Sequence, residues 1–259
     1  MNELVALDTV DLALCLGMVG VAIALSLWQK LGLANQFIFS AGRALLQLLI
    51  VGYALDIVFA LDSLVAVLII LLIMTSIAAI VARNRIDKKI KTLLPIVWLS
   101  IFTSTAITLS YMILVIIQPT TTWYEPQYLI PLGGMLLGNA MNGASLSGDR
   151  LISAIKQNYR EIETHLCLGA TPKQAIFQYQ KEAIRAGLIP ILNNMLVVGL
   201  VSLPGMFTGQ VLAGANPLNA ASYQILILFA IALTNLIVTV LVTEGVYRHF
   251  FNQDLQLLI

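Results

Sequence analysis

Residues 63–82 read SLVAVLIILLIMTSIAAIVA, a run without a single charged side chain. A helix needs about 20 apolar residues to cross the hydrocarbon core of a bilayer, and this run has that length. The composition of the whole chain agrees, since 59% of its 259 residues are hydrophobic and only 10% are charged, against about 25% charged in soluble domains. We therefore expect an all-α, polytopic membrane protein that forms a single transmembrane domain over residues 1–259.

Six further apolar stretches have a similar length, so that seven transmembrane helices are expected. They cover residues 10–28, 38–59, 63–82, 93–117, 128–147, 188–212 and 222–247. No charge occurs from Ala186 to Thr243, a run too long for one helix, and the sequence Gly-Ala-Asn-Pro at 214–217 supplies a break. Within the sixth span, Pro204 is expected to kink the helix and, with Gly205, to form a candidate hinge.

The basic residues set the expected orientation. With seven spans, all 14 Lys and Arg side chains fall on one side of the membrane, while the opposite loops carry Asp56, Asp62 and Glu125 and the N-terminal region carries Glu3. Basic loops stay in the cytoplasm, so the N-terminus is expected outside and the C-terminus in the cytoplasm. The net charge is only +1, which provides no field for nucleic acid, and no nucleic-acid partner is expected.

Residues 148–187 form the one large polar segment, and we expect a long cytoplasmic helical hairpin between the fifth and sixth spans. One helical face carries the apolar residues of its first half, namely Leu151, Ile155, Tyr159, Ile162 and Leu166. Gly169 is expected to end this helix. The sequence Thr171-Pro172-Lys173-Gln174 then predicts a new helix with a capping box. The hairpin is either an amphipathic connector on the membrane surface or a docking element for a cytoplasmic partner.

The spacing of residues in the hairpin favours docking. It resembles the coupling signature of ABC-transporter permeases, which is Glu-Ala-Ala, three residues, Gly, and a Leu-Pro pair further on. Here Glu163-Thr164-His165 precedes Gly169 by the same spacing, and Ile189-Pro190 follows. Both alanines of the signature are replaced. The residues expected to couple to an ATPase are Glu163, Leu168, Gly169, Ala170, Thr171 and Pro172.

Several short motifs along the chain carry a family resemblance. They are Gly42-Arg43-Ala44 with Gln47-Leu48, residues 51–53, Ile130-Pro131, Gly134-Met135, residues 138–141, 168–172 and 199–206, Gly209 and residues 223–225. With them the chain resembles the FetB-type iron-export permeases of bacteria and the plant half-size ABC permeases implicated in aluminium tolerance. The resemblance implies a multi-pass permease subunit of the bacterial inner membrane, homodimeric or otherwise paired, that exports iron with two separately encoded ATP-binding cassette subunits.

Polar and thioether side chains inside the spans are candidates for the transport path. They are Arg43, Gln47, Met135, Asn139, Met141, Asn142, Asn193, Asn194 and Met206. Each type has a structural alternative: Arg43 could snorkel to the headgroups, methionines often fill gaps in packing, and asparagines bond across helices. The pairs Gly134/Gly138 and Gly205/Gly209 predict close helix packing within the subunit, or else a dimer face.

The sequence contains no motif that indicates an enzyme. It contains no phosphate-binding loop, so ATP hydrolysis is expected in a partner, and neither a cofactor site nor a cluster with metal-ligand spacing is expected. Other interpretations remain open: a nucleotide-sugar or other small solute as cargo, as the plant branch suggests, or a membrane scaffold or relay that transports nothing. A secondary transporter is disfavoured, because the spans offer no carboxylate at mid-depth for ion coupling.

Overall fold

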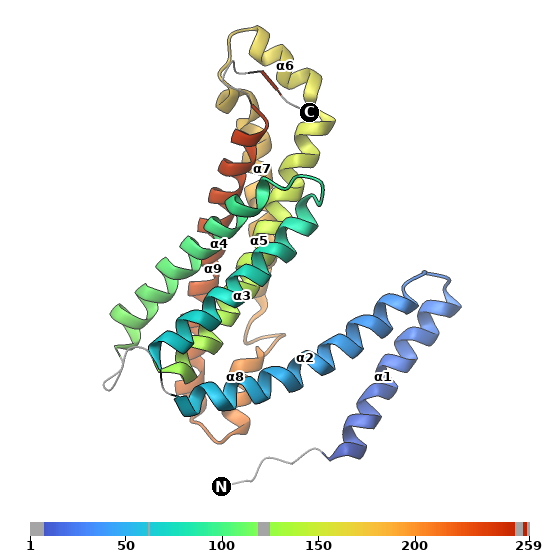
Figure 1. Ribbon diagram of the computed structural model, residues 1–259, viewed down its shortest axis with the longest axis vertical. Coiled ribbons are helices and arrows are strands. Elements are labelled where there is room, and N and C mark those ends of the chain that lie inside the picture. Colours follow the sequence, from blue (N-terminus) through green and yellow to red (C-terminus); the bar gives the residue numbers. More distant parts are fainter. Residues whose placement is uncertain (1–7, 62, 119–124, 252–255, 258–259) are drawn as a thin grey trace. The chain divides into compact units, whose positions relative to one another are not determined.

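The computed structural model describes residues 8–61, 63–118, 125–251 and 256–257 (Figure 1). Glu3 and Asp62, which entered the expected orientation, lie outside these residues. The elements are helices: α1 (Thr9–Trp28), α2 (Ala34–Leu61), α3 (Leu64–Ile86), α4 (Leu93–Tyr111), the π-helix η1 (Met112–Ile117), α5 (Pro126–Gln157), α6 (Tyr159–Cys167), α7 (Pro172–Val197), α8 (Gly205–Leu212) and α9 (Pro217–His249). No strand occurs among the described residues beyond two isolated bridges, which confirms the all-α class.

Among the residues that the structure describes, four helical segments are long and apolar enough to cross a membrane. They are Ala34–Phe59, Leu64–Ile86, Leu93–Ile117 and Pro217–His249, and Leu14–Trp28 forms a shorter apolar helix. The fifth expected span lies within α5, whereas the sixth covers the end of α7, the turn after it and α8. Both α5 and α7 also carry polar residues of the hairpin. The count of seven spans and their orientation stay predictions.

The chain forms two compact units. The first comprises residues 1–63 with 212–214, and the second comprises residues 64–211 with 215–259. In the first unit, α1 and α2 pack as an antiparallel pair (Figure 1). The turn between them contains Lys30 (φ +52°) and Gly32 (φ +69°), both in the left-handed region.

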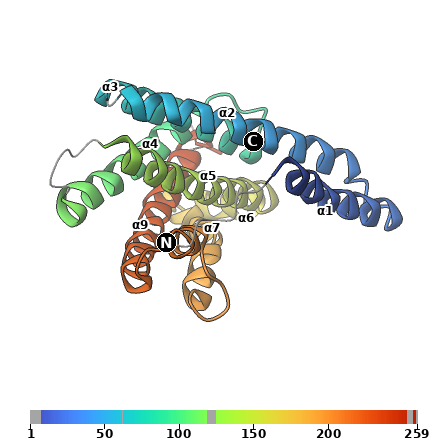
Figure 2. The ribbon, with the colours of Figure 1, turned by 90° about the horizontal axis from the view of Figure 1, so that it is seen from below.

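In the second unit, α5 is the central helix and packs against α3, α4, α7 and α9 (Figures 1 and 2). Its contact with α7 and α9 is especially close. A Cβ added at Gly187 would lie 2.6 Å from Cγ2 of Thr239 and 3.0 Å from the carbonyl oxygen of Gly143, and one added at Gly143 would overlap the side-chain oxygen of Asn235. These two glycines therefore let the backbones of α5 and α7 approach each other beside α9.

The glycine pairs predicted from the sequence do not have this role within the subunit. A Cβ added at Gly138, Gly205 or Gly209 would meet nothing within 4 Å, and one at Gly134 would meet only the end of the Met74 side chain, at 3.1 Å. The prediction of close packing inside the subunit is therefore wrong for the first three.

The sixth expected span is not one kinked helix. α7 ends at Val197, and a turn with Gly199 in the left-handed region (φ +82°) and a bridge between Val198 and Ser202 leads to α8. Pro204 lies directly before α8 rather than inside a helix, so the predicted kink at that proline is wrong. The proline inside α7 is Pro190. The break predicted at 214–217 is confirmed, with Gly214 at φ +86° and Asn216 capping α9.

The hairpin contains three helices rather than two. α5 continues without interruption from the fifth expected span to Gln157, and α6 starts at Tyr159 after Asn158 (φ −112°). The predicted apolar face is buried, with Leu151, Ile155 and Ile162 fully enclosed. α7 runs from the hairpin tip into the sixth expected span as one helix. Both long helices of the hairpin are therefore continuous with the helices of the bundle.

Candidate functional site

The tip of the hairpin is a tightly bonded turn. The N–H of Ala170 donates to the carbonyl of His165, and the N–H of Gly169 donates to that of Leu166, both at 3.0 Å. This pair of bonds is the Schellman motif, which requires a left-handed residue just past the helix end. Gly169 has that conformation, with φ +91°. The predicted end of the helix at Gly169 is therefore confirmed within two residues.

A capping box starts the next helix at once. Oγ1 of Thr171 accepts from the N–H of Gln174 at 3.3 Å, while Oε1 of Gln174 accepts from the N–H of Thr171 at 2.9 Å. Pro172 takes the first helical position, where its missing N–H costs nothing. The capping box at Thr171 follows directly on Ala170, the last residue of the Schellman motif, so the tip has a single defined shape.

The tip exposes an apolar side chain and lines a groove. Leu168 is 80% exposed at the end of the hairpin. Next to it, a groove of about 730 Å³ is lined by Glu163, Leu166, Cys167, Gly169, Ala170, Thr171, Gln256 and Leu257. The structure thus brings four of the six predicted coupling residues to one groove, with Leu168 beside it, while Pro172 is buried.

Two residues near the end of the chain, Gln256 and Leu257, also line this groove. Leu257 bridges to Phe251 and packs against the hydrophobic core beside the hairpin. No motif marks Gln256 or Leu257, and only the tertiary structure places them beside the tip.

One ionic contact ties the hairpin to the loop after α3, and a second polar contact lies within the hairpin. Nζ of Lys156 in α5 lies 3.1 Å from a carboxylate oxygen of Asp87, just past α3. The backbone N–H of Lys89 and the Lys156 ammonium together lower the pKa of Asp87 below its usual value, against a smaller opposing effect of burial. Between α6 and α7, burial and a hydrogen bond to Glu161 raise the pKa of Tyr179 to about 12.

A buried glutamine joins the hairpin to α9. Gln180 in α7 is 8% exposed, and its amide donates to Oε2 of Glu244 at 3.4 Å and to Oγ1 of Thr243 at 3.5 Å. The sequence analysis did not predict this link. A glutamine on the apolar stripe of a helix, three residues before the buried Ala183, was the available signal.

Three of the predicted path residues share one face of α5. Met135, Asn139 and Asn142 follow the i, i+4, i+7 spacing of a helical stripe, and this stripe is half-buried to exposed. The Asn139 amide donates to the carbonyl of Met135 at 2.8 Å, and Oδ1 of Asn142 accepts from Arg85 at 3.0 Å. Met141 points away from the stripe and packs against the core.

The other predicted path residues lie elsewhere. Asn193 and Asn194 are exposed on α7, and Met206 is half-buried on α8. Arg43 and Gln47 are exposed on α2, in the first unit. Among the described residues, His, Cys, Asp and Glu form no group of three that could hold a metal ion.

The sequence matches known proteins over nearly its full length. The family described as "Uncharacterised protein family (UPF0014)" matches residues 9–251. A UPF0014 membrane protein of Synechocystis is 60% identical over 258 residues, covering 100% of this chain and 99% of the relative. The "Probable iron export permease protein FetB" of Escherichia coli is 37% identical over 249 residues, covering 96% and 94%.

A plant relative matches as well. The "Protein ALUMINUM SENSITIVE 3" of Arabidopsis thaliana is 34% identical over 245 residues, covering 95% of this chain and 88% of the relative. No solved structure matches the chain significantly. Because the family match and the bacterial and plant relatives all span almost the whole sequence, the chain belongs to the UPF0014 family.

Proposed function

We propose that this chain is the membrane-spanning permease subunit of an ATP-driven exporter of iron, and that residues 1–259 act as one permease domain in the bacterial inner membrane. The similarity to the iron export permease FetB over 96% of the chain supports the cargo and the direction of transport. The chain supplies no ATPase of its own, so the energy comes from a separate ATP-binding cassette subunit.

The observation that carries this proposal is the tip of the hairpin. A rigid turn presents Leu168 at 80% exposure next to a groove that contains Glu163 and Ala170. An exposed apolar anchor with a polar rim is typical of a site that a protein partner covers. The helices behind it, α5 and α7, continue into the bundle, so a force on the tip reaches the helices that would carry the path.

The transport path is proposed along the exposed stripe of α5. Asparagine side chains are costly in contact with lipid, and in the expected bilayer Asn139 is half-buried and Asn142 exposed on α5. In a homodimer this stripe would face the second copy across a polar path, to which Asn193, Asn194 and Met206 would contribute. Arg43 and Gln47, in the first unit, are further proposed path residues. Pro204 and Gly205, in the turn before α8, would serve as the hinge.

The first experiment is a gentle detergent purification of the tagged chain from its native membrane, with mass spectrometry of the proteins that accompany it. A stoichiometric ATP-binding subunit supports the proposal and provides the complex for iron transport into vesicles. If no such subunit is found under conditions that preserve other complexes of this class, the coupling role of the hairpin is wrong.

A pair of charge variants then locates the contact. Ala170→Glu places a carboxylate in the groove at the tip, while Gln157→Glu adds the same charge at the exposed end of α5. Ala170→Glu should abolish ATP hydrolysis stimulated by the permease, and Gln157→Glu should leave it unchanged. Equal hydrolysis in both variants would place the partner elsewhere on the chain.

A further inference from the structure

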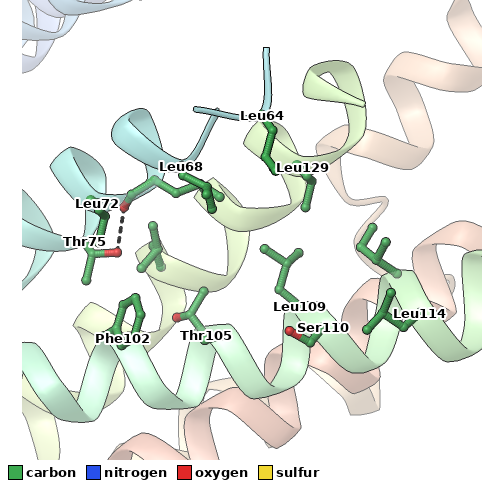
Figure 3. A pocket seen from close by; sticks show the side chains of 14 residues that line it. Leu64, Leu68, Leu72, Thr75, Phe102, Thr105, Leu109, Ser110, Leu114 and Leu129 are labelled. Carbon is green, nitrogen blue, oxygen red and sulfur yellow. Dashed lines mark hydrogen bonds between the residues drawn. The ribbon is translucent and has the colours of Figure 1, made fainter. Parts of the chain in front are cut away.

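A cavity of about 300 Å³ lies in the second unit, between α3, α4, η1 and α5 (Figure 3). Its wall is made of leucine, isoleucine, alanine and phenylalanine side chains and three hydroxyls, those of Thr75, Thr105 and Ser110. None of the lining residues is charged. A volume of this size lies at the lower end of the range of small-molecule sites.

The cavity runs through one half of the expected membrane. It extends along α3 from Leu64 to Thr75, a length of about 16 Å at the rise of an α-helix. Half of the hydrocarbon core of a bilayer measures about 15 Å. The hairpin packs near the other end of α3, where Gly148 approaches Ile86, so the cavity belongs to the leaflet away from the hairpin and ends near mid-depth.

The two ends of the cavity differ in chemistry. The end near the membrane surface is lined by Leu64, Leu114 and Leu129 (Figure 3). Leu114 belongs to the π-helix η1. Such π-turns occur frequently at functional sites. The end at mid-depth carries Thr105 and Phe102, whose ring stacks on Trp98 with centroids 5.1 Å apart.

At this inner end, the hydroxyl of Thr105 is free to donate a hydrogen bond. Its side chain is 6% exposed, and its hydroxyl has no partner in the described structure. The usual acceptor, the carbonyl of Ile101 one turn earlier, already accepts from Ser104 at 3.0 Å. Thr75, across the cavity, shows the ordinary case, since its hydroxyl donates to the carbonyl of Leu71 at 2.7 Å (Figure 3). A buried polar group without a partner is costly.

We propose that this cavity binds a neutral, single-chain lipid whose aliphatic part fills the leucine-lined end and whose carbonyl oxygen accepts a hydrogen bond from Thr105. The wall offers no partner for a charge, which excludes an ionised head inside the cavity. The hydroxyl of Thr105 supplies the donor that a carbonyl needs. This site is independent of the proposed transport function, because none of its residues belongs to the hairpin tip or to the polar stripe of α5.

Photolabelling of the purified full-length chain in detergent tests the site. The probes are a twelve-carbon methyl ketone with a diazirine near the end of its chain and the matching hydrocarbon without the carbonyl. Mass spectrometry then maps the labelled residues. In the wild type, the ketone should label the cavity wall about fivefold more than the hydrocarbon does, as one additional hydrogen bond implies.

Three variants distinguish binding through the Thr105 hydrogen bond from occupancy of the cavity by any apolar chain. Thr105→Val keeps the shape and removes the hydroxyl, so the ketone should lose its advantage. Ala106→Phe fills the cavity from its wall and should abolish labelling by both probes, whereas Ile107→Phe adds the same ring on the exposed side of α4 and should change nothing. Equal labelling by the two probes in the wild type, or an undiminished preference for the ketone in Thr105→Val, would overturn the proposal.

Discussion

Gly169 is the residue on which the shape of the hairpin tip depends. It adopts φ +91° and donates its N–H to the carbonyl of Leu166. An L-residue in the left-handed region costs about 1–2 kcal/mol, and proline cannot adopt that conformation or donate the bond. Both requirements are local, which is why the helix end and the capping box could be predicted from the sequence.

Gly169→Pro should therefore abolish permease-stimulated ATP hydrolysis, and Gly169→Ala should reduce it, while the chain still inserts into the membrane. Hydrolysis by the purified complex and the amount of chain in the membrane fraction measure the two effects. Gly214→Ala is the matched control, because Gly214 has a similar backbone angle, φ +86°, in the turn before α9. A loss of hydrolysis in Gly214→Ala as well would show that backbone strain alone, and not the tip, is responsible.

Tyr179 makes the stability of the hairpin depend on pH under alkaline conditions. Burial and Glu161 raise the pKa of its phenol from 10.0 to about 12. A group whose pKa is higher in the folded state contributes stability that is present below the unfolded pKa and is lost as the pH rises through the folded pKa. Between pH 10 and 12, the thermal midpoint of the wild type should thus fall more steeply than that of Tyr179→Phe. If the thermal midpoints of the wild type and Tyr179→Phe fall equally steeply with pH, the raised pKa of Tyr179 is contradicted.

At the scale of elements, the sequence predicted where helices exist better than which faces they bury. In an apolar helix such as α3, the lipid-facing and core-facing sides have the same composition, so no amphipathic pattern marks the packed face. The sequence also does not distinguish the close contacts at Gly143 and Gly187 from the open positions at Gly138 and Gly209, because which glycine meets a neighbouring helix depends on tertiary packing. The break after Val197 was missed on similar grounds, since an apolar run looks the same whether or not the helix continues, and Gly199 was its only sign.

The contact between α5 and α7 should tolerate no added methyl group. In Gly187→Ala, the new Cβ would lie 3.0 Å from a backbone oxygen and 2.6 Å from Thr239, and overpacking of this kind costs about 1–3 kcal/mol. The midpoint of thermal unfolding in detergent should fall accordingly. Gly138→Ala adds the same methyl group to α5 in open space and should leave the midpoint unchanged or raise it. Equal midpoints for the two variants would show that the helices separate easily at Gly187.

At the scale of the whole molecule, the tip and the path should be separable by mutation. Asn139→Leu leaves the hairpin intact but removes a polar side chain from the stripe of α5. The complex should still assemble and hydrolyse ATP, while iron export from cells falls several-fold, as measured by retained radioactive iron. If Asn139→Leu and Asn142→Leu leave iron export unchanged while Gly169→Pro abolishes it, the chain relays a signal and does not line the path.

The fold of the whole chain also shows how far the path could be predicted. The spacing of Met135, Asn139 and Asn142 is readable in the sequence, and the structure places all three on one face. Arg43 and Gln47 belong to the other compact unit, an assignment that rests on tertiary contacts that no local pattern encodes. The same holds for Gln256 and Leu257 at the hairpin groove.

The close contact at Gly187 gives α7 the mechanics of a lever. The helix extends about 22 Å from this point to Pro172 at the tip and about 15 Å to Val197 at its other end. If the contact with Gly143 acts as the fulcrum, a push on the tip moves the far end in the opposite direction by about two thirds of the distance. Pro190 lies on the short arm, three residues beyond the fulcrum, where the missing backbone bond lets that arm bend. An inward stroke at the hairpin would therefore become an outward stroke where α7 meets the turn before α8.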